Sequence, residues 1–534
     1  MNSKMRRLRR RLLAIFVGTL ILGIASIVNA QDSTPEPTPE PTTEVTEVAP
    51  VAEVTEVAPV VDTTSTVPPV DISVEVPPVD EIEIVDPIAE LSSVFASTVA
   101  VDTIWVFLTG FLVFFMQTGF ALLEAGLVRQ TGVVNALLEN FIDAGLTAII
   151  FWAVGFGVAF GTDAGGFIGT DNFFLAKAFD ISNGAITFNS ITFANPDILY
   201  PNLSVLTFFF FQFAFAATAS TITTGAMAER TDYVGDLIYT GIMAAITYPV
   251  VVHWVWGGGW LADNWFLDFA GGTVVHTVGG ITAIIGAWML GPRPNRKFGE
   301  FPPPHNMALA TLGTMILWFG WYGFNPGSTL GVGNTNLIGL VTLNTTLGAG
   351  AGAVVAMLFI YFRTGRWDLV FTLNGSLAGL VAITPGCAFV TPTSALIIGG
   401  LAGIFVYFGV ELIEALKIDD PVGAFAVHAV NGIWGTLSIG LFAQAEIVSN
   451  VTAGALTRGG LLTGGGADQL MWQAIGVGAT VLWISVTSFI MFGALKMINR
   501  LRVDKVADAI GIDAYEHQAS AWPDVLPIQT YTKE

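Results

Sequence analysis

The chain has 534 residues, of which 53% are apolar and only 12% are charged, and its mean hydropathy is +0.67. A soluble fold of this composition would have almost no charged side chains for its surface, so we expect a polytopic membrane protein. The net charge of −21 gives no reason to expect a nucleic-acid partner. The single cysteine, Cys387, excludes an internal disulfide and a cysteine-based metal cluster.

The N-terminal part of the chain carries the signs of a targeting segment followed by a spacer. Basic residues crowd residues 4–11, and an apolar stretch then runs to Val28 and ends in Asn29 and Ala30. We expect a signal peptide over residues 1–30, with an uncleaved anchor as the alternative because the apolar stretch is long. Residues 31–92 are rich in Pro, Thr, Glu and Val, which predicts a disordered acidic stalk that cannot bury enough apolar surface to fold.

Eleven apolar segments follow within a predicted channel domain, residues 93–500. They lie at 103–127, 138–160, 203–227, 234–256, 270–291, 306–325, 338–362, 369–390, 394–416, 421–443 and 469–498. If the mature N-terminus is outside the cell, the outer loops hold only Lys177 and Arg458, and the other loops hold the remaining basic residues of the domain. This asymmetry follows the positive-inside rule and predicts a multi-pass protein of the cytoplasmic membrane with a cytoplasmic C-terminus.

The order of the segments also predicts an internal repeat. Because five is odd, two consecutive blocks of five spans must lie in opposite orientations, an arrangement that is common in transporters. His276 lies in the last span of the first block, and His428 lies in the last span of the second. We therefore expect an all-α integral membrane protein with an inverted five-plus-five repeat and one extra helix.

His276 and His428 stand alone in long uncharged runs, and each follows an acid, Asp268 or Asp420, by eight residues. If both runs are helices that cross the bilayer in opposite directions, a rise of ~1.5 Å per residue puts the rings about 12 Å from opposite faces, near the midplane. Ionisable side chains at that depth are costly and mark conduction paths, proton relays or ligand sites. The alternative is two satisfied core histidines, and the matched depth of the rings argues against it.

Aromatic residues gather toward the expected outer mouth. The segments are HWVWGGGW at 253–260, FQFAFAATAST at 211–221 and GWYGFNPGS at 320–328. One interpretation is an aromatic belt at the membrane interface. The other is a site for a small cation, held by cation–π attraction of about 1 kcal/mol. Trp256 precedes three glycines that expose backbone carbonyls. Phe215 and Phe324 lie among small residues, and Ser328 follows a Pro-Gly break.

Inside that mouth the segments are apolar, and we expect no acid near either histidine. A permanent cation would lose its hydration there without replacement, so the path suits a neutral molecule or a proton relay between imidazoles. Asp268 is expected to cap the start of the fifth span, with direct cation binding as the alternative. Glu124, close to the inner end of the first span, is expected to face the cytoplasm or to be paired.

These segments together resemble the ammonium transporter and Rhesus glycoprotein family. The matching stretches are GFALLEAGLVR at 119–129, GAMAER at 225–230, HWVWGGG at 253–259, FLDFAGGTVVH at 266–276, GWYGFNPGS at 320–328 and DDPVGAFAVHAVNGIWG at 419–435. They span nearly all of residues 100–500 in family order. The resemblance implies a homotrimer in which each subunit has its own pore through eleven helices.

The resemblance also implies roles for individual residues. His276 and His428 would be the twin pore histidines, and Phe215 and Phe324 would be stacked gates. Trp256, Phe215 and Ser328 would form an outer ammonium site that Asp268 supports. Ammonium would be recruited there, lose its proton and cross the apolar pore as ammonia.

The C-terminal segment, residues 501–534, is expected to be a cytoplasmic regulatory tail. Its stretch GIDAYEHQASAW at 511–522 resembles the family segment that helps control the pore and receives PII-type nitrogen signalling proteins. A PII-type protein is therefore a possible partner by resemblance. The acidic stalk departs from the family pattern, whose outer N-terminus is usually short.

Two other functions fit parts of the pattern. In a membrane cytochrome, His276 and His428 would be axial haem ligands, since imidazole pairs bind haem iron. In an ammonium sensor the tail would signal and flux would be incidental, although no kinase or receiver-like domain follows residue 500. The sequence has no Gly-Lys dipeptide and hence no Walker A loop, which excludes an ATP-driven pump of that type. We expect a transporter that is not an enzyme and needs no cofactor.

Overall fold

The computed structural model describes residues 87–182, 185–191, 203–300 and 302–525. The expected signal peptide and most of the expected stalk lie outside the described residues. Helix α2 (Pro87–Leu127) begins within the last residues that the sequence analysis gave to the stalk. The helical part of the chain therefore starts slightly before the expected boundary at residue 93.

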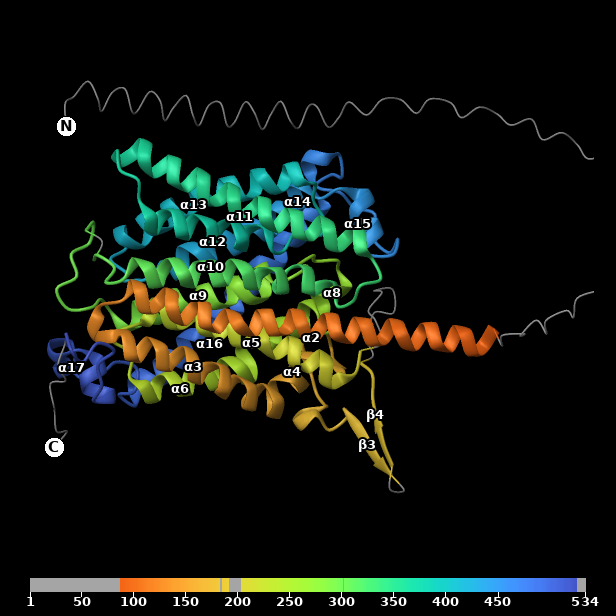
Figure 1. Ribbon diagram of the computed structural model, residues 1–534, viewed down its shortest axis with the longest axis horizontal. Coiled ribbons are helices and arrows are strands. Elements are labelled where there is room, and N and C mark those ends of the chain that lie inside the picture. The colour runs from red at the N-terminus through yellow and green to blue at the C-terminus, as the bar shows by residue number, and fades with distance from the viewer. Residues whose placement is uncertain (1–86, 183–184, 192–202, 301, 526–534) are drawn as a thin grey trace, which may run out of the picture.

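Long helices lie side by side, with their axes along the longest dimension of the molecule (Figure 1). After α2, the long and short α-helices together are α3 (Val133–Ile150), α4 (Phe156–Phe160), α5 (Val205–Met227), α6 (Tyr233–Ile242), α7 (Tyr248–Val255), α8 (Trp260–Asp263), α9 (Val278–Leu290), α10 (Met307–Phe324), α11 (Thr335–Thr364), α12 (Leu369–Ile383), α13 (Pro392–Ala415), α14 (Asn431–Phe442), α15 (Ala445–Val451), α16 (Asp468–Met497) and α17 (Lys505–Ile510).

Short strands form two antiparallel hairpins. Strand β1 (Asp163–Ala164) pairs with β2 (Ile168–Gly169), and β3 (Phe179–Ser182) pairs with β4 (Ala185–Phe188). Figure 1 places β3, β4, α8 and α15 at one end of the helical bundle and α17 at the other. We call these the hairpin end and the tail end of the molecule.

Ten helices in the described residues are long and apolar enough to cross a membrane, and α12 is a shorter apolar helix of 15 residues. The sequence predicted a span over 369–390, but α12 ends at Ile383. Pro385 has no N–H to continue the helical hydrogen bonds, so the helix stops although Thr384 still has helical φ and ψ, and the chain continues as a buried turn to Val390. The multi-pass helical architecture is confirmed, whereas the number of eleven spans stays a prediction.

The two histidine-bearing spans each contain a π-helical turn, η5 (Gly272–Thr277) and η7 (Phe425–Val430). Such turns are rare and occur often at functional sites. The sequence analysis assumed regular helices that extend from Asp268 to His276 and from Asp420 to His428. That assumption was wrong, because both acids lie in the loops that precede the turns. The depth of about 12 Å that followed from it does not apply to this geometry.

Glycines bring α11, α12 and α13 into backbone contact. A Cβ atom on Gly352 would lie 2.2 Å from the backbone oxygen of Gly375 in α12, and one on Gly399 in α13 would lie 2.3 Å from the backbone oxygen of Gly348. Only glycine permits this approach without a shift of one helix. Glycine therefore acts as a packing residue between these three helices.

Buried ion pairs join the loops at the tail end. The Arg293 guanidinium lies 2.8 Å from the carboxylate of Asp419 and 2.5 Å from that of Glu229. Burial alone would raise the pKa of Asp419, but its bonds to Arg293 hold that pKa well below the ordinary value. Burial lowers the pKa of Arg230 to about 10, so this side chain is still charged at neutral pH. It donates to the backbone oxygens of Gly291 and Asp419.

The C-terminal segment docks on the same end of the bundle. The Asp513 carboxylate accepts hydrogen bonds of 2.9 Å from the backbone N–H groups of Val134 and Asn135, in the first turn of α3. The His517 ring lies 2.9 Å from the side-chain oxygen of Asn135. Because no side chain within the loop before α3 caps this helix, the tail supplies its cap.

Candidate functional site

The two histidines meet inside the bundle. The Nδ1 atoms of His276 and His428 lie 3.2 Å apart, and the ring centroids are 5.3 Å apart with an angle of 29° between the planes. Both side chains are buried. A hydrogen bond between the two Nδ1 atoms needs a proton on one and a lone pair on the other, so the neutral rings must adopt opposite tautomers.

Each histidine turn is held at its start by an acid. Asp268 accepts hydrogen bonds of 2.7–3.0 Å from four backbone N–H groups, those of residues 271–274. Asp420 accepts in the same way from residues 422, 423 and 425. Burial raises the pKa of Asp268 to about 6 and also raises that of Asp420, although these bonds act in the opposite direction. The capping interpretation of Asp268 is therefore what the geometry shows.

Each of the two turns is preceded by a glycine at the same distance from its acid. Gly271 lies three residues after Asp268 and has φ of 111°, and Gly423 lies three residues after Asp420 and has φ of 81°. Residues with a side chain rarely adopt this left-handed backbone conformation, which only glycine reaches without strain. No capping role was predicted for Asp420 from the sequence. Its spacing of eight residues to His428, equal to that of Asp268 to His276, was the feature that could have predicted this role.

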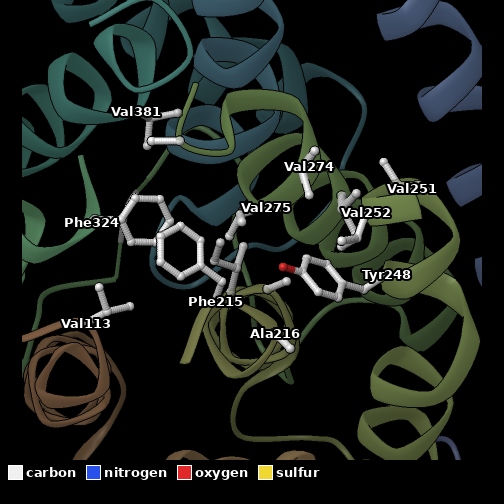
Figure 2. Close-up of a cluster of buried hydrophobic side chains, with 14 of the residues drawn as sticks. Val113, Phe215, Ala216, Tyr248, Val251, Val252, Val274, Val275, Phe324 and Val381 are labelled. Carbon is white, nitrogen blue, oxygen red and sulfur yellow. The ribbon is translucent and has the colours of Figure 1, made fainter. Parts of the chain in front are cut away.

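An aromatic stack lies next to the histidine pair. Phe215 of α5 and Phe324 of α10 lie face to face, with centroids 4.2 Å apart and an interplanar angle of 26° (Figure 2). The Phe324 ring is 5.4 Å from the His276 ring, and Trp321 stacks on the same imidazole at 5.2 Å. Both rings of the stack are buried.

A cavity of about 30 Å³ lies next to this stack. It is lined by Phe208, Phe211, Gln212, Phe215, Trp256, Phe269, Ser328 and Leu330. Three predicted residues, Trp256, Phe215 and Ser328, therefore share one cavity. The Asp268 side chain does not line it, but the Asp268 backbone oxygen accepts a hydrogen bond of 2.8 Å from the Trp256 indole N–H.

The other residues that line this cavity were not predicted from the sequence. Phe208, Phe211 and Phe215 follow one another at helical spacing in α5 and so share a face of that helix. Gln212 lies in the same helix, four residues after Phe208, so helical spacing signals it as well. Phe269 and Leu330 come from separate loops, and nothing in their local sequence signals that they meet.

A second cavity, of about 20 Å³, lies next to His428. It is lined by Phe120, Leu123, Glu124, Ile222, Asn374, Leu377, Val422, Ala424, Val427 and His428. The expectation that no acid lies near either histidine was wrong, because Glu124 and His428 line the same small space. Glu124 comes from α2, and hydropathy does not show which faces of distant helices meet.

The geometry does not suit a metal or haem centre. In the described residues, no group of three or more His, Cys, Asp or Glu side chains is placed to hold a metal ion. The rings of His276 and His428 contact each other through their Nδ1 atoms, which leaves no room for a porphyrin between them. The membrane cytochrome alternative requires a haem between the two imidazoles, and their contact does not allow it.

Comparisons with known proteins agree with this arrangement. A model of the Ammonium Transporter Family matches residues 104–522. Ammonium transporter Amt2 of Archaeoglobus fulgidus is 38% identical over 445 residues, which cover 80% of this chain and 90% of that protein. Ammonium transporter 3 of Dictyostelium discoideum is 36% identical over 441 residues, which cover 81% and 96%.

Solved structures share the fold as well. A protein described as Sensor Amt Protein superposes with a TM-score of 0.69 at 38% identity, over 79% of this chain and 99% of that one. Mep2 of Candida albicans superposes with a TM-score of 0.68 at 31% identity, over 76% and 87%. The chain belongs to the ammonium transporter family.

Proposed function

We propose that this protein recruits ammonium at the hairpin-end cavity, removes its proton there, and conducts ammonia past the His276–His428 pair. The observation that carries the proposal is the contact of two buried imidazoles through their Nδ1 atoms. Ionisable groups at membrane depth are retained at a cost and mark a conduction path or proton relay. The substrate is ammonium, and the medium is a lipid bilayer.

The cavity of about 30 Å³ that Trp256, Phe215 and Ser328 line, called the outer cavity below, has the chemistry of an ammonium site. The Trp256 and Phe215 rings are 6.1 Å apart at an angle of 77°, so two aromatic rings border one small space. Such rings attract a cation by about 1 kcal/mol, and by about 2 or more when the cation is desolvated. The Ser328 hydroxyl donates to the Phe324 backbone oxygen at 2.8 Å, so its lone pairs can accept from ammonium.

The stack of Phe215 and Phe324 favours the neutral species. A cation that passed these buried rings would lose its hydration without replacement, whereas ammonia loses much less. Ammonium would therefore give its proton to a water molecule at the outer cavity, from which it would pass to Nε2 of His276, an atom with no hydrogen-bond partner among the described residues. Ammonia would pass when the two rings move apart.

The histidine pair can accept ammonia and also carry the proton. With one proton between the Nδ1 atoms, one ring presents a bare Nε2 and the other presents an Nε2–H. Ammonia can then donate to the first ring and accept from the second. When a proton is added at the bare Nε2 of one ring, the proton between the Nδ1 atoms moves to the other ring, and that ring releases its own Nε2 proton. The same geometry can therefore conduct protons.

We propose that α12 is also a membrane span, which gives eleven, and that the hairpin end faces outside. The positive-inside asymmetry of the sequence supports this orientation. The matched series Asp268, Gly271, His276 and Asp420, Gly423, His428 supports an inverted repeat. We place the protein in the cytoplasmic membrane with its tail in the cytoplasm.

We also propose a homotrimer with one pore in each subunit. Large apolar side chains are exposed on α10, for example Leu312 and Phe319, and on α13, for example Phe408 and Leu412. In a membrane such faces can pack against lipid or against another copy. The docked tail lies at the proposed cytoplasmic surface, where a PII-type protein could reach it.

Ammonium sensing is a second function with some support. The neighbour at 38% identity is described as a sensor, and the tail of this chain caps α3 at the tail end of the bundle. In that case ammonium in the pore would change the docking of the tail. Flux would still follow from the pore that both functions share.

The outer site is tested by Trp256→Ala in liposomes that contain the full-length protein. Loss of the indole should weaken the apparent affinity for ammonium about fivefold, the equivalent of about 1 kcal/mol. The measurement is the ammonium-evoked current as a function of concentration. Trp367→Ala is the matched control, because Trp367 is exposed and lines neither cavity. Equal affinity in the wild type and both variants would contradict the site.

A further inference from the structure

We propose that the cavity between His428 and Glu124 is an inner ammonium site, in which the Glu124 carboxyl group returns a proton to ammonia. The inference rests on the proposed function, because ammonia must reach this cavity as a neutral molecule. It assigns the second half of the transport step, the re-formation of ammonium, to a named group.

The cavity is placed and sized for this step. Its volume of about 20 Å³ holds one molecule of the size of water or ammonia. Of the ten described residues that line it, Glu124 and His428 are the titratable ones, and Asn374 is the one further polar side chain. The outer cavity, on the opposite side of the histidines, has no acidic lining residue in the described part of the chain.

Helix α2 brings the carboxyl group to this position. Phe120 and Glu124 are four residues apart and lie on one face of the helix, and the Phe120 ring is 6.2 Å from the His428 ring. Gly225 of α5 leaves space for the carboxylate, since a Cβ atom there would lie 3.1 Å from Glu124 Oε1. The acid is therefore fitted into the wall of the cavity.

The contacts of Glu124 indicate more than a packing role. Its side chain accepts from Asn140 Nδ2 at 2.8 Å and from the Thr224 hydroxyl at 3.0 Å, and the residue is 2% exposed. The ion pairs of the described residues do not include it. A glutamine could still accept from Asn140 through its single oxygen at a lower cost of burial, and the Thr224 hydroxyl has another acceptor in the Thr221 backbone oxygen at 2.7 Å. What the carboxyl group adds is the ability to take up and release a proton.

The proton step balances without another reactant. A proton relayed by the histidine pair passes from His428, through a water molecule in the cavity, to the Glu124 carboxylate and gives the neutral acid, and ammonia then takes the place of that water. The acid then donates that proton to ammonia, so that ammonium forms and the carboxylate is restored. Ammonium leaves toward the tail end, and the net result is the transfer of one ammonium ion.

The test uses the full-length protein in liposomes with two readouts of one ammonium jump. The evoked current reports the proton, and the alkalinisation of a pH dye inside the liposomes reports ammonia. Glu124→Gln should lower the current by about a hundredfold, as expected for loss of a positioned proton-transfer group. It should also increase the alkalinisation, because ammonia that enters without its proton takes one from the interior buffer, whereas net entry of ammonium does not. Glu139→Gln is the matched control, because Glu139 is equally buried but does not line the cavity. Its current should equal that of the wild type.

Glu124→Asp provides a second variant that keeps an acid. It should retain more current than Glu124→Gln but less than the wild type, with an alkalinisation between those of the two. A wild-type current in Glu124→Gln would overturn the proposal. So would a loss of current without an increase in alkalinisation in a protein that elutes and melts like the wild type, because Glu124 would then only keep the path open. A wild-type protein that gives no response to ammonium would instead defeat the proposed function itself.

Discussion

Asp268 and Asp420 orient the histidines through the backbone. Each carboxylate binds the N–H groups at the start of a π-helical turn that carries a histidine. A negative charge at this position is also favoured by the positive end of the helix dipole. Asp268 supports the outer cavity by the same means, since its backbone oxygen holds the Trp256 indole. A residue that the resemblance assigns to ammonium binding is thus explained by its contacts with the protein itself.

The substitution Asp268→Asn should therefore damage structure and transport together. An amide NH₂ cannot accept, so two of the four hydrogen bonds would be lost, at a cost of about 2–4 kcal/mol in the free energy of unfolding. Thermal denaturation in detergent measures the loss, and the ammonium-evoked current measures the effect on His276. Asp263→Asn, at an exposed acid of the neighbouring helix, is the control. Equal melting of both variants and the wild type would contradict this account.

At the scale of the element, close backbone contact sets the positions of α11, α12 and α13. Adding a methyl group at Gly352 should force α12 away, because the new Cβ would lie 2.2 Å from the Gly375 oxygen. We expect Gly352→Ala to lower the free energy of unfolding by about 1–3 kcal/mol. Gly350→Ala, on the same helix with nothing within 4 Å of its Cβ, should melt like the wild type. The idea fails if the two variants melt at one temperature.

The tail is a second element whose docking can be predicted. Burial raises the pKa of docked Asp513 from 3.8 to about 6, despite two backbone N–H donors. The docked state therefore takes up a proton between these pH values, so docking should strengthen as pH falls through about 6 and weaken as pH rises. Hydrogen exchange of residues 505–522, corrected for intrinsic rates, measures this. Asp513→Asn should abolish the dependence, and protection that increases with pH would contradict it.

At the scale of the whole molecule, the helical architecture could be predicted from the sequence more completely than the contacts between helices could. Hydropathy located the spans because burial in lipid requires long apolar segments. The odd block length and the matched positions of His276 and His428 predicted that the two rings would meet. Glu124 could not be placed in this way, because pore contacts depend on helix rotation and packing, which hydropathy does not contain. The π-helical turns were missed because backbone capping by Asp268 and Asp420 decides where each helix starts.

The central claim is that ammonium transport depends on two imidazoles in contact. The most direct measurement is the ammonium-evoked current of the double variant His276→Ala, His428→Ala in liposomes. His305→Ala serves as control, because its ring contacts the backbone oxygen of Val128 away from the pair. We predict that the control keeps the wild-type current and that the double variant, folded and reconstituted equally, loses its proton-coupled current. A double variant with the wild-type current and selectivity would contradict the account.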